Sequence, residues 1–177
     1  MCASSCVAYM GPYIDLNACP RCDQPRFFSD TTCARKHFLT IPIGPVIQSL
    51  YQSLDMATHM HYLEKTLACN TLYLDTHQGG LDVYDNTACG KDLMDAWRSG
   101  AFSSSDVALQ FSIDGAQLHP DQPSEAWVFI WVVHNLPPNM RYTKAFVILA
   151  AIVPGPNKPA EIDSFLFPLL YHVAALQ

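Results

Sequence analysis

Residues 106–119 read DVALQFSIDGAQLH, and this stretch decides how the second half of the chain is expected to fold. Its apolar residues recur at every second position, at Val107, Leu109, Phe111 and Ile113. This two-residue period is typical of a β-strand. The pattern predicts a strand that runs into a turn carrying Asp114. A carboxylate at the end of a buried strand is costly unless it binds something, typically a metal ion.

Two more strands and a helix are predicted after this stretch. Residues 126–134 are almost entirely apolar, which indicates a strand buried on both faces in a helix-flanked sheet. A turn leads to a third strand over residues 145–153, and the prolines of PGPNKP then break the chain. An amphipathic helix follows, with Pro168 inside it, or in its first turn if Ser164 is the cap. Short turns between the strands favour an antiparallel meander.

The first half of the chain is predicted to be mainly helical. Residues 45–69 place their apolar side chains on one helical face, whereas residues 70–85 are typical of a loop. A further helix is predicted over residues 86–99, with Asn86 or Thr87 as its cap. The fold class predicted from these elements is mixed α/β, of the α+β type.

Four of the seven cysteines form two close pairs with the spacing C-x3-C-x12-C-x2-C, and these are Cys2, Cys6, Cys19 and Cys22. Two such pairs can supply four thiolates to a tetrahedral zinc ion. A short Pro/Gly-rich segment cannot build its own core, so the metal would fold it. The alternative is a set of unligated or redox-active thiols. The remaining three cysteines are isolated in the sequence.

The charge of the chain is unevenly distributed. The net charge of −6 argues against a free-standing nucleic-acid binder, which is usually basic. Residues 1–40 nevertheless carry four basic residues against three acids. Within them the ARKH cluster makes Arg35 and Lys36 candidates for contacts with DNA phosphates, the alternative being a solvated loop.

The sequence predicts neither a membrane span nor a secretory signal. No apolar run approaches the roughly 18 residues that cross a bilayer. The first residues, MCASSCVAYMGPY, lack a basic region followed by a long apolar stretch. We therefore expect an intracellular protein without a membrane partner.

Several stretches resemble the transposases of CACTA (En/Spm-type) DNA transposons, particularly their versions in mushroom-forming fungi. In the second half these are SIDGAQL, VVHNLPPNMRY, VPGPNKP and EIDSFLFPLLYHVAAL. In the first half they are CPRC, RKHFLTIPIGP and LDVYDNTACGKD. The resemblance covers nearly the whole chain.

The resemblance implies a DDE/D-type catalytic core with an RNase H-like fold. In such a core three acids hold two divalent ions, Mg²⁺ or Mn²⁺, about 3.5–4 Å apart. Asp114 matches the first acid by its place on the first strand, and the other two would lie beyond Gln177. Asp163 is interpreted instead as a cap or dipole partner of the last helix. We therefore expect a fragment without a complete active site.

The expected organisation is a zinc module at 1–26, a linker at 27–44, a helical region at 45–100 and half of the core at 101–177. The resemblance also implies transposon-end DNA and other transposase subunits as partners, and a nuclear location. One alternative is a non-catalytic, zinc-containing DNA- or protein-binding module derived from a transposase. Another is an unrelated zinc-ribbon interaction protein in which Asp114 is only a turn acid.

Overall fold

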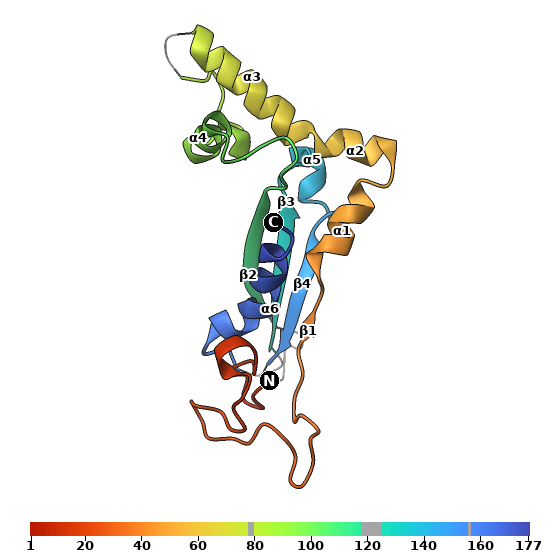
Figure 1. The fold of residues 1–177 in the computed structure, drawn as a ribbon, viewed down its shortest axis with the longest axis vertical. Helices are drawn as coiled ribbons and strands as arrows, with labels where there is room; N and C mark the ends of the chain where they lie inside the picture. Colours follow the sequence, from red (N-terminus) through yellow and green to blue (C-terminus); the bar gives the residue numbers. More distant parts are fainter. Residues whose placement is uncertain (78–79, 118–124, 156) are drawn as a thin grey trace. The chain divides into compact units, whose positions relative to one another are not determined.

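The protein is described here by a computed structural model of residues 1–77, 80–117, 125–155 and 157–177. Helices are combined with one four-stranded antiparallel sheet of strand order β1-β4-β3-β2. The strands are β1 Leu39–Thr40, β2 Leu109–Gln117, β3 Glu125–Val133 and β4 Ile148–Pro154. Figure 1 shows β2, β3 and β4 side by side, as a meander requires. The α+β class is confirmed.

The first strand of the meander differs from its prediction at Asp114. β2 continues through Asp114 to Gln117, so the predicted turn at this acid is wrong. The physical reason lies at Gly115, where an added Cβ would lie 3.2 Å from the ring of Trp127. The glycine serves a close contact with the tryptophan of β3 and does not reverse the chain. The last two residues of the stretch, 118–119, lie outside the described residues.

The other two strands of the meander are confirmed, with shifted ends. Both faces of β3 are buried, as its apolar run predicts, with Phe129, Val132 and Val133 each at most 3% exposed. β4 begins three residues later than predicted. The preceding segment stays turned, because the amides of Phe146 and Val147 donate to the carbonyl of Thr143.

The segment predicted as a linker contains the short strand β1. It pairs antiparallel with β4, with Leu39 opposite Ile152 and Thr40 opposite Ala151. The next amide, that of Ile41, donates to the carbonyl of Ala150 at 2.8 Å. β1 therefore covers the middle of the β4 edge.

The helices of the first half are α1 Ile43–Leu50, α2 Leu54–Met60, α3 Tyr62–Thr76 and α4 Lys91–Ser99. The predicted single stretch at 45–69 is thus divided. The hydroxyl of Ser53 caps α2 by accepting from the amide of Met56. α3 extends into residues predicted as a loop, because the side-chain amide of Asn70 donates to the carbonyl of Ala88 at 3.1 Å and Leu74 packs against the core cluster around Leu67.

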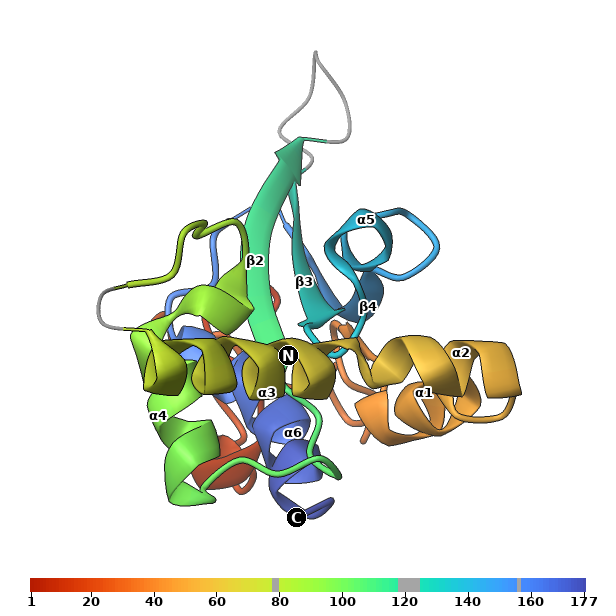
Figure 2. The same cartoon turned by 90° about the horizontal axis from the view of Figure 1, so that it is seen from above.

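The helix predicted over residues 86–99 begins as a separate 3-10 turn, η2 Thr87–Cys89. Asn86 caps this turn as predicted, its side-chain oxygen accepting from the amide of Ala88 at 2.8 Å. Gly90 then precedes α4, and Gly100 ends α4 in the left-handed conformation at φ 74°. In Figures 1 and 2, α4 lies alongside α3.

The chain ends in α6 Ile162–Ala174, after the short helix α5 Pro138–Arg141. Asp163 lies in the first turn of α6, where a carboxylate favours the positive end of the helix dipole, as predicted. Ser164 is not the cap, since Glu161 holds that position. Pro168 lies inside the helix, which is the first of the two predicted placements.

The chain divides into two compact units. The first comprises residues 1–46, 111–130 and 148–177, and the second comprises residues 47–110 and 131–147. Both units draw on distant parts of the sequence. No helix in the described ranges is long and apolar enough to cross a membrane.

Candidate metal centre

The four paired cysteines come together in the first unit. The Sγ atoms of Cys2, Cys6, Cys19 and Cys22 all lie within 4.8 Å of one another. The sulfur of Cys22 is 3.5 Å from that of Cys2 and 3.7 Å from that of Cys6. A tetrahedral zinc ion with Zn–S bonds of about 2.3 Å requires sulfur–sulfur distances of about 3.8 Å. The cluster therefore has nearly the dimensions of a four-thiolate zinc site.

Two similar turns present the cysteines. The carbonyl of Cys2 accepts from the amide of Ser5 at 3.0 Å, and that of Cys19 accepts from the amide of Asp23 at 2.9 Å. The donating residues both take a left-handed conformation, with φ of 62° and 54°. This conformation is uncommon outside glycine. Each turn folds the second cysteine of its pair back toward the first.

Peptide N–H groups face the first thiol of each pair. Burial opposes ionisation of Cys2, but hydrogen bonds from the amides of Cys6 and Ser4, with the neighbouring thiols, outweigh it and lower the pKa of Cys2. At Cys19 burial prevails and raises the pKa, although the amide of Arg21 favours the thiolate. Such N–H groups stabilise the deprotonated sulfur, which is the form that binds a metal.

The thiols also hinder one another's ionisation. Burial and the thiols of Cys22 and Cys2 raise the pKa of Cys6 to about 12. Four thiolates this close together need a cation between them. An all-sulfur donor set selects a soft or borderline metal, and zinc is the commonest in four-cysteine sites. The donor set and its spacing therefore fit a metal such as zinc.

Tyr9 provides a further polar group beside the cluster. Its side chain is 4% exposed, and in the described part of the chain its hydroxyl has no hydrogen-bond partner. Burial and the charges of Cys2 and Cys19 raise the pKa of Tyr9 to about 12, so the hydroxyl remains a donor. The Tyr9 side chain thus packs against Cys2 and Cys19 and leaves an unpaired donor beside the cluster.

The cysteine turns are attached to the segment that joins β4 to α6. The carbonyl of Cys6 accepts from the amides of Ala160 and Glu161 at 3.1 and 2.8 Å. The amide of Ala8 donates to the hydroxyl of Ser164 at 2.8 Å. Figure 1 shows the N-terminal segment, in red, beside the start of α6. A metal at the cluster would therefore also support this part of the unit.

Of the two residues predicted to contact DNA, Lys36 is already hydrogen-bonded within the protein. Its ammonium donates to the carbonyl of Ala3 at 3.2 Å, to the hydroxyl of Ser5 at 3.0 Å and to the carbonyl of Gly155. Burial lowers the pKa of Lys36. Arg35 is exposed, with its guanidinium 6.0 Å from the ring of Phe28. Arg35 is thus the better placed of the two for a phosphate.

Asp114, unlike the four cysteines, is not part of a cluster of potential metal ligands in the described residues. Its carboxylate is exposed and accepts from the amide of Gly115 at 2.8 Å. Among the described residues, no group of three metal-ligating side chains includes Asp114. The Mg²⁺ or Mn²⁺ role of Asp114 stays a prediction.

Sequence reasoning missed Tyr9 and Ser5, which support the cluster. Neither belongs to a spaced motif, so no sequence signal marks either residue.

Comparison of the chain with protein-family models, with curated proteins and with solved structures finds no match. The fold and the site together define an α+β protein with a four-cysteine cluster suited to a metal such as zinc.

Proposed function

We propose that this chain is part of a cut-and-paste DNA transposase of the CACTA type, stabilised by zinc at Cys2, Cys6, Cys19 and Cys22. The observation that carries the proposal is the attachment of the four-cysteine cluster to a meander followed by a helix. Three antiparallel strands and a helix, with an acid on the first strand, are the elements that open an RNase H-like core. Asp114 on β2 would be the first acid of that core.

The proposed chemistry is two-metal phosphoryl transfer. In the full-length family the ions activate water or a 3′-hydroxyl and stabilise the leaving oxygen. Asp114 would hold one side of the Mg²⁺ or Mn²⁺ pair. One carboxylate cannot hold two ions, so we propose that the chain does not cleave DNA by itself.

Metal analysis of the purified chain tests the zinc part. We expect about one zinc per chain, retained after dialysis, and loss of that zinc in Cys22→Ser. Cys33→Ser is the matched control, because Cys33 is an exposed thiol outside the cluster. Zinc near zero, with all four paired thiols open to alkylation, would refute this part.

Assays on transposon-end DNA test the transposase part. We expect binding of the chain to such DNA without Mg²⁺- or Mn²⁺-dependent strand cleavage. Cleavage that disappears in Asp114→Asn would show that the chain carries a complete active site after all. If the zinc-bound chain does not bind transposon-end DNA, this result would count against a transposase.

A non-catalytic DNA- or protein-binding module is the second candidate. It is favoured by the exposed carboxylate of Asp114, which accepts from the adjacent amide of Gly115. Among the described residues, Asp114 belongs to no group of side chains that could hold a metal. Salt-sensitive DNA binding that is lost in Arg35→Ala but unaffected by Asp114→Asn would support it. Lys36→Ala is less informative, since Lys36 also supports the cysteine turns.

A further inference from the structure

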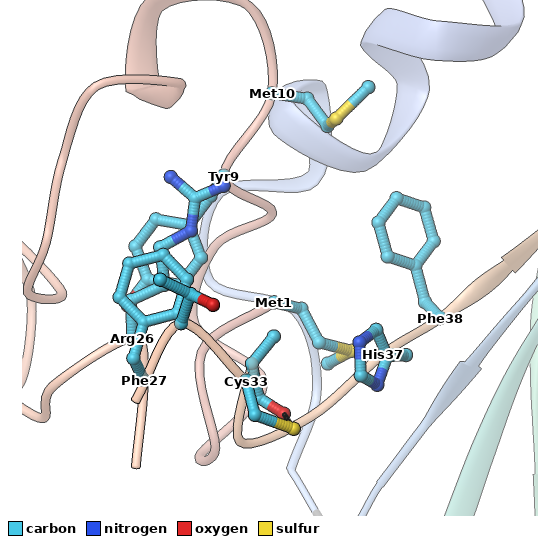
Figure 3. Close-up of a pocket in the computed structure, with 10 residues that line it drawn as sticks. Met1, Tyr9, Met10, Arg26, Phe27, Cys33, His37 and Phe38 are labelled. Atoms are coloured by element: carbon cyan, nitrogen blue, oxygen red, sulfur yellow. Dashed lines mark hydrogen bonds between the residues drawn. The ribbon is translucent and has the colours of Figure 1, made fainter. Parts of the chain in front are cut away.

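A cavity of about 490 Å³ opens in the first unit beside the cysteine cluster. Tyr9 belongs to both, since it packs with Cys2 and Cys19 and also lines the cavity. Figure 3 shows Arg26 and Phe27 with Tyr9 on one side and Phe38 on the other. No described residue that lines the cavity is acidic.

Arg26 packs against two aromatic rings at one wall of this cavity. Its guanidinium carbon lies 4.9 Å from the centre of the Tyr9 ring and 5.0 Å from that of Phe27. Its Nη1 donates to the carbonyls of Ile14 and Leu16. Among the described residues, Nε and Nη2 have no hydrogen-bond acceptor. The guanidinium is therefore oriented in advance, with donors left for an anion.

A hairpin next to the cavity adds a second basic and aromatic pair. It is closed by hydrogen bonds from the amide of Phe28 to Cys33 and from the amide of Arg35 to Arg26, at 3.1 and 3.0 Å. Phe28 is 53% exposed, and Arg35 lies above its ring. Asp30, at the tip, is the acid of this hairpin.

We infer that the cavity and hairpin bind an unpaired nucleotide of a single-stranded nucleic acid. The base would stack against Phe27 and Phe38, and its phosphates would contact Arg26 and Arg35. Aromatic platforms combined with basic side chains are the usual means of binding single strands. A base inside a duplex is already stacked and cannot enter such a cavity. The inference goes beyond the proposed function, because it depends on the cavity and not on the transposase assignment.

Filling the cavity tests the base contact. The zinc-loaded full chain is titrated against a fluorescent oligothymidylate of about 12 nucleotides and against a duplex of equal length, by anisotropy. We expect tighter binding of the single strand. Cys33→Trp fills the mouth of the cavity without changing charge, and we expect it to weaken single-strand binding about tenfold. Cys69→Trp, at an exposed thiol of the second unit, is the matched control and retains wild-type affinity.

Removing charge tests the phosphate contact. Arg35→Ala removes one exposed guanidinium, and we expect the slope of log affinity against log salt to flatten by about 0.7. Lys144→Ala removes an exposed charge from the second unit and leaves the slope unchanged. These exposed positions keep the inference testable if Cys33→Trp loses zinc or unfolds.

Three results would overturn the inference. They are single-strand binding no tighter than duplex binding, equal effects of the two tryptophan variants, and an unchanged salt slope in Arg35→Ala. If the oligonucleotide does not bind but an aromatic peptide occupies the cavity, the cavity is a site for a protein partner instead. Zinc and transposon-end binding without single-strand binding would refute only this inference. Single-strand binding without transposon-end recognition would refute only the proposed function.

Discussion

His134 lies at the centre of a buried polar network in the second unit. Its Nδ1 accepts from Nη1 of Arg141 at 2.6 Å and contacts the hydroxyl of Thr87 at 2.8 Å. Its Nε2 lies 2.8 Å from the side-chain oxygen of Gln110. A guanidinium can only donate, so Nδ1 is the acceptor and the ring proton resides on Nε2. The network therefore requires a neutral imidazole.

This network predicts a loss of stability in acid. Burial and the charge of Arg141 lower the pKa of His134 below its ordinary 6.5. The unfolded chain binds a proton near pH 6.5 while the folded chain resists it, so stability is full above that pH. As pH falls from 6.5 toward the folded pKa, the free energy of unfolding should decrease by at most about 1.4 kcal/mol per unit.

Denaturant unfolding at pH 7.5 and pH 5 measures this effect. His134→Gln should flatten the pH dependence, whereas His59→Gln, at a half-exposed position outside this network, should not. An equal pH dependence in the wild type and His134→Gln would show that another group dominates.

The hydroxyl of Tyr9 gives a second prediction at the residue scale. If it donates to a metal-bound thiolate, Tyr9→Phe should keep one zinc per chain but weaken zinc binding about tenfold. Competition with a colorimetric chelator measures the affinity, and Tyr13→Phe in η1 is the control. Unchanged affinity in Tyr9→Phe would mean that the hydroxyl does not serve the sulfurs.

At the scale of elements, the turn η1 Gly11–Tyr13 packs against α6 through a glycine. Gly11 has φ 54°, and a Cβ added there would lie 2.6 Å from the ring of Phe167. Gly100, after α4, has φ 74° but no atom within 4 Å of the added Cβ. An alanine would be strained by the positive φ at both positions, but only at Gly11 would it also collide with a neighbour.

This pair separates packing from backbone strain. Gly100→Ala should lower the free energy of unfolding by about 1 kcal/mol, the cost of a left-handed alanine. Gly11→Ala should lower it by about 3 kcal/mol, because overpacking against Phe167 adds to that strain. Denaturant unfolding compares the two, and equal losses would mean that Phe167 moves aside freely.

At the scale of the whole molecule, the first unit joins the beginning of the chain to its last helix. The carbonyl of Cys6 and the amide of Ala8 both bond to residues 160–164. Metal removal should therefore affect α6 as well as the cysteine turns, although α6 holds no predicted ligand.

Hydrogen exchange after chelation measures this coupling. We expect faster exchange at the amides of Ala8 and Glu161 when zinc is removed, because Ala8 follows the first cysteine turn and donates to Ser164, and Glu161 donates to the carbonyl of Cys6. The amides of Ala88 and Met94 in the second unit should change much less. Uniform acceleration would show that the two units unfold as one.

The sequence by itself determined the strands of the meander, the last helix and the four cysteines that come together as a possible metal site. These follow from local properties, namely two-residue alternation over 107–113, an apolar run over 126–134 and fixed cysteine spacing. Local chemistry also predicted the cap at Asn86, because a cap depends only on its nearest neighbours.

The tertiary structure alone decided what depends on distant partners. Next to the predicted turn at Asp114, Gly115 packs against Trp127. The ammonium of Lys36 donates to Ala3, Ser5 and Gly155 and does not face a phosphate. The C-terminal half of α3 is held by Asn70, which donates to the carbonyl of Ala88, and by Leu74, which packs on the same cluster. Propensity and spacing cannot encode these outcomes, because each is fixed by a side chain or carbonyl far away in the sequence.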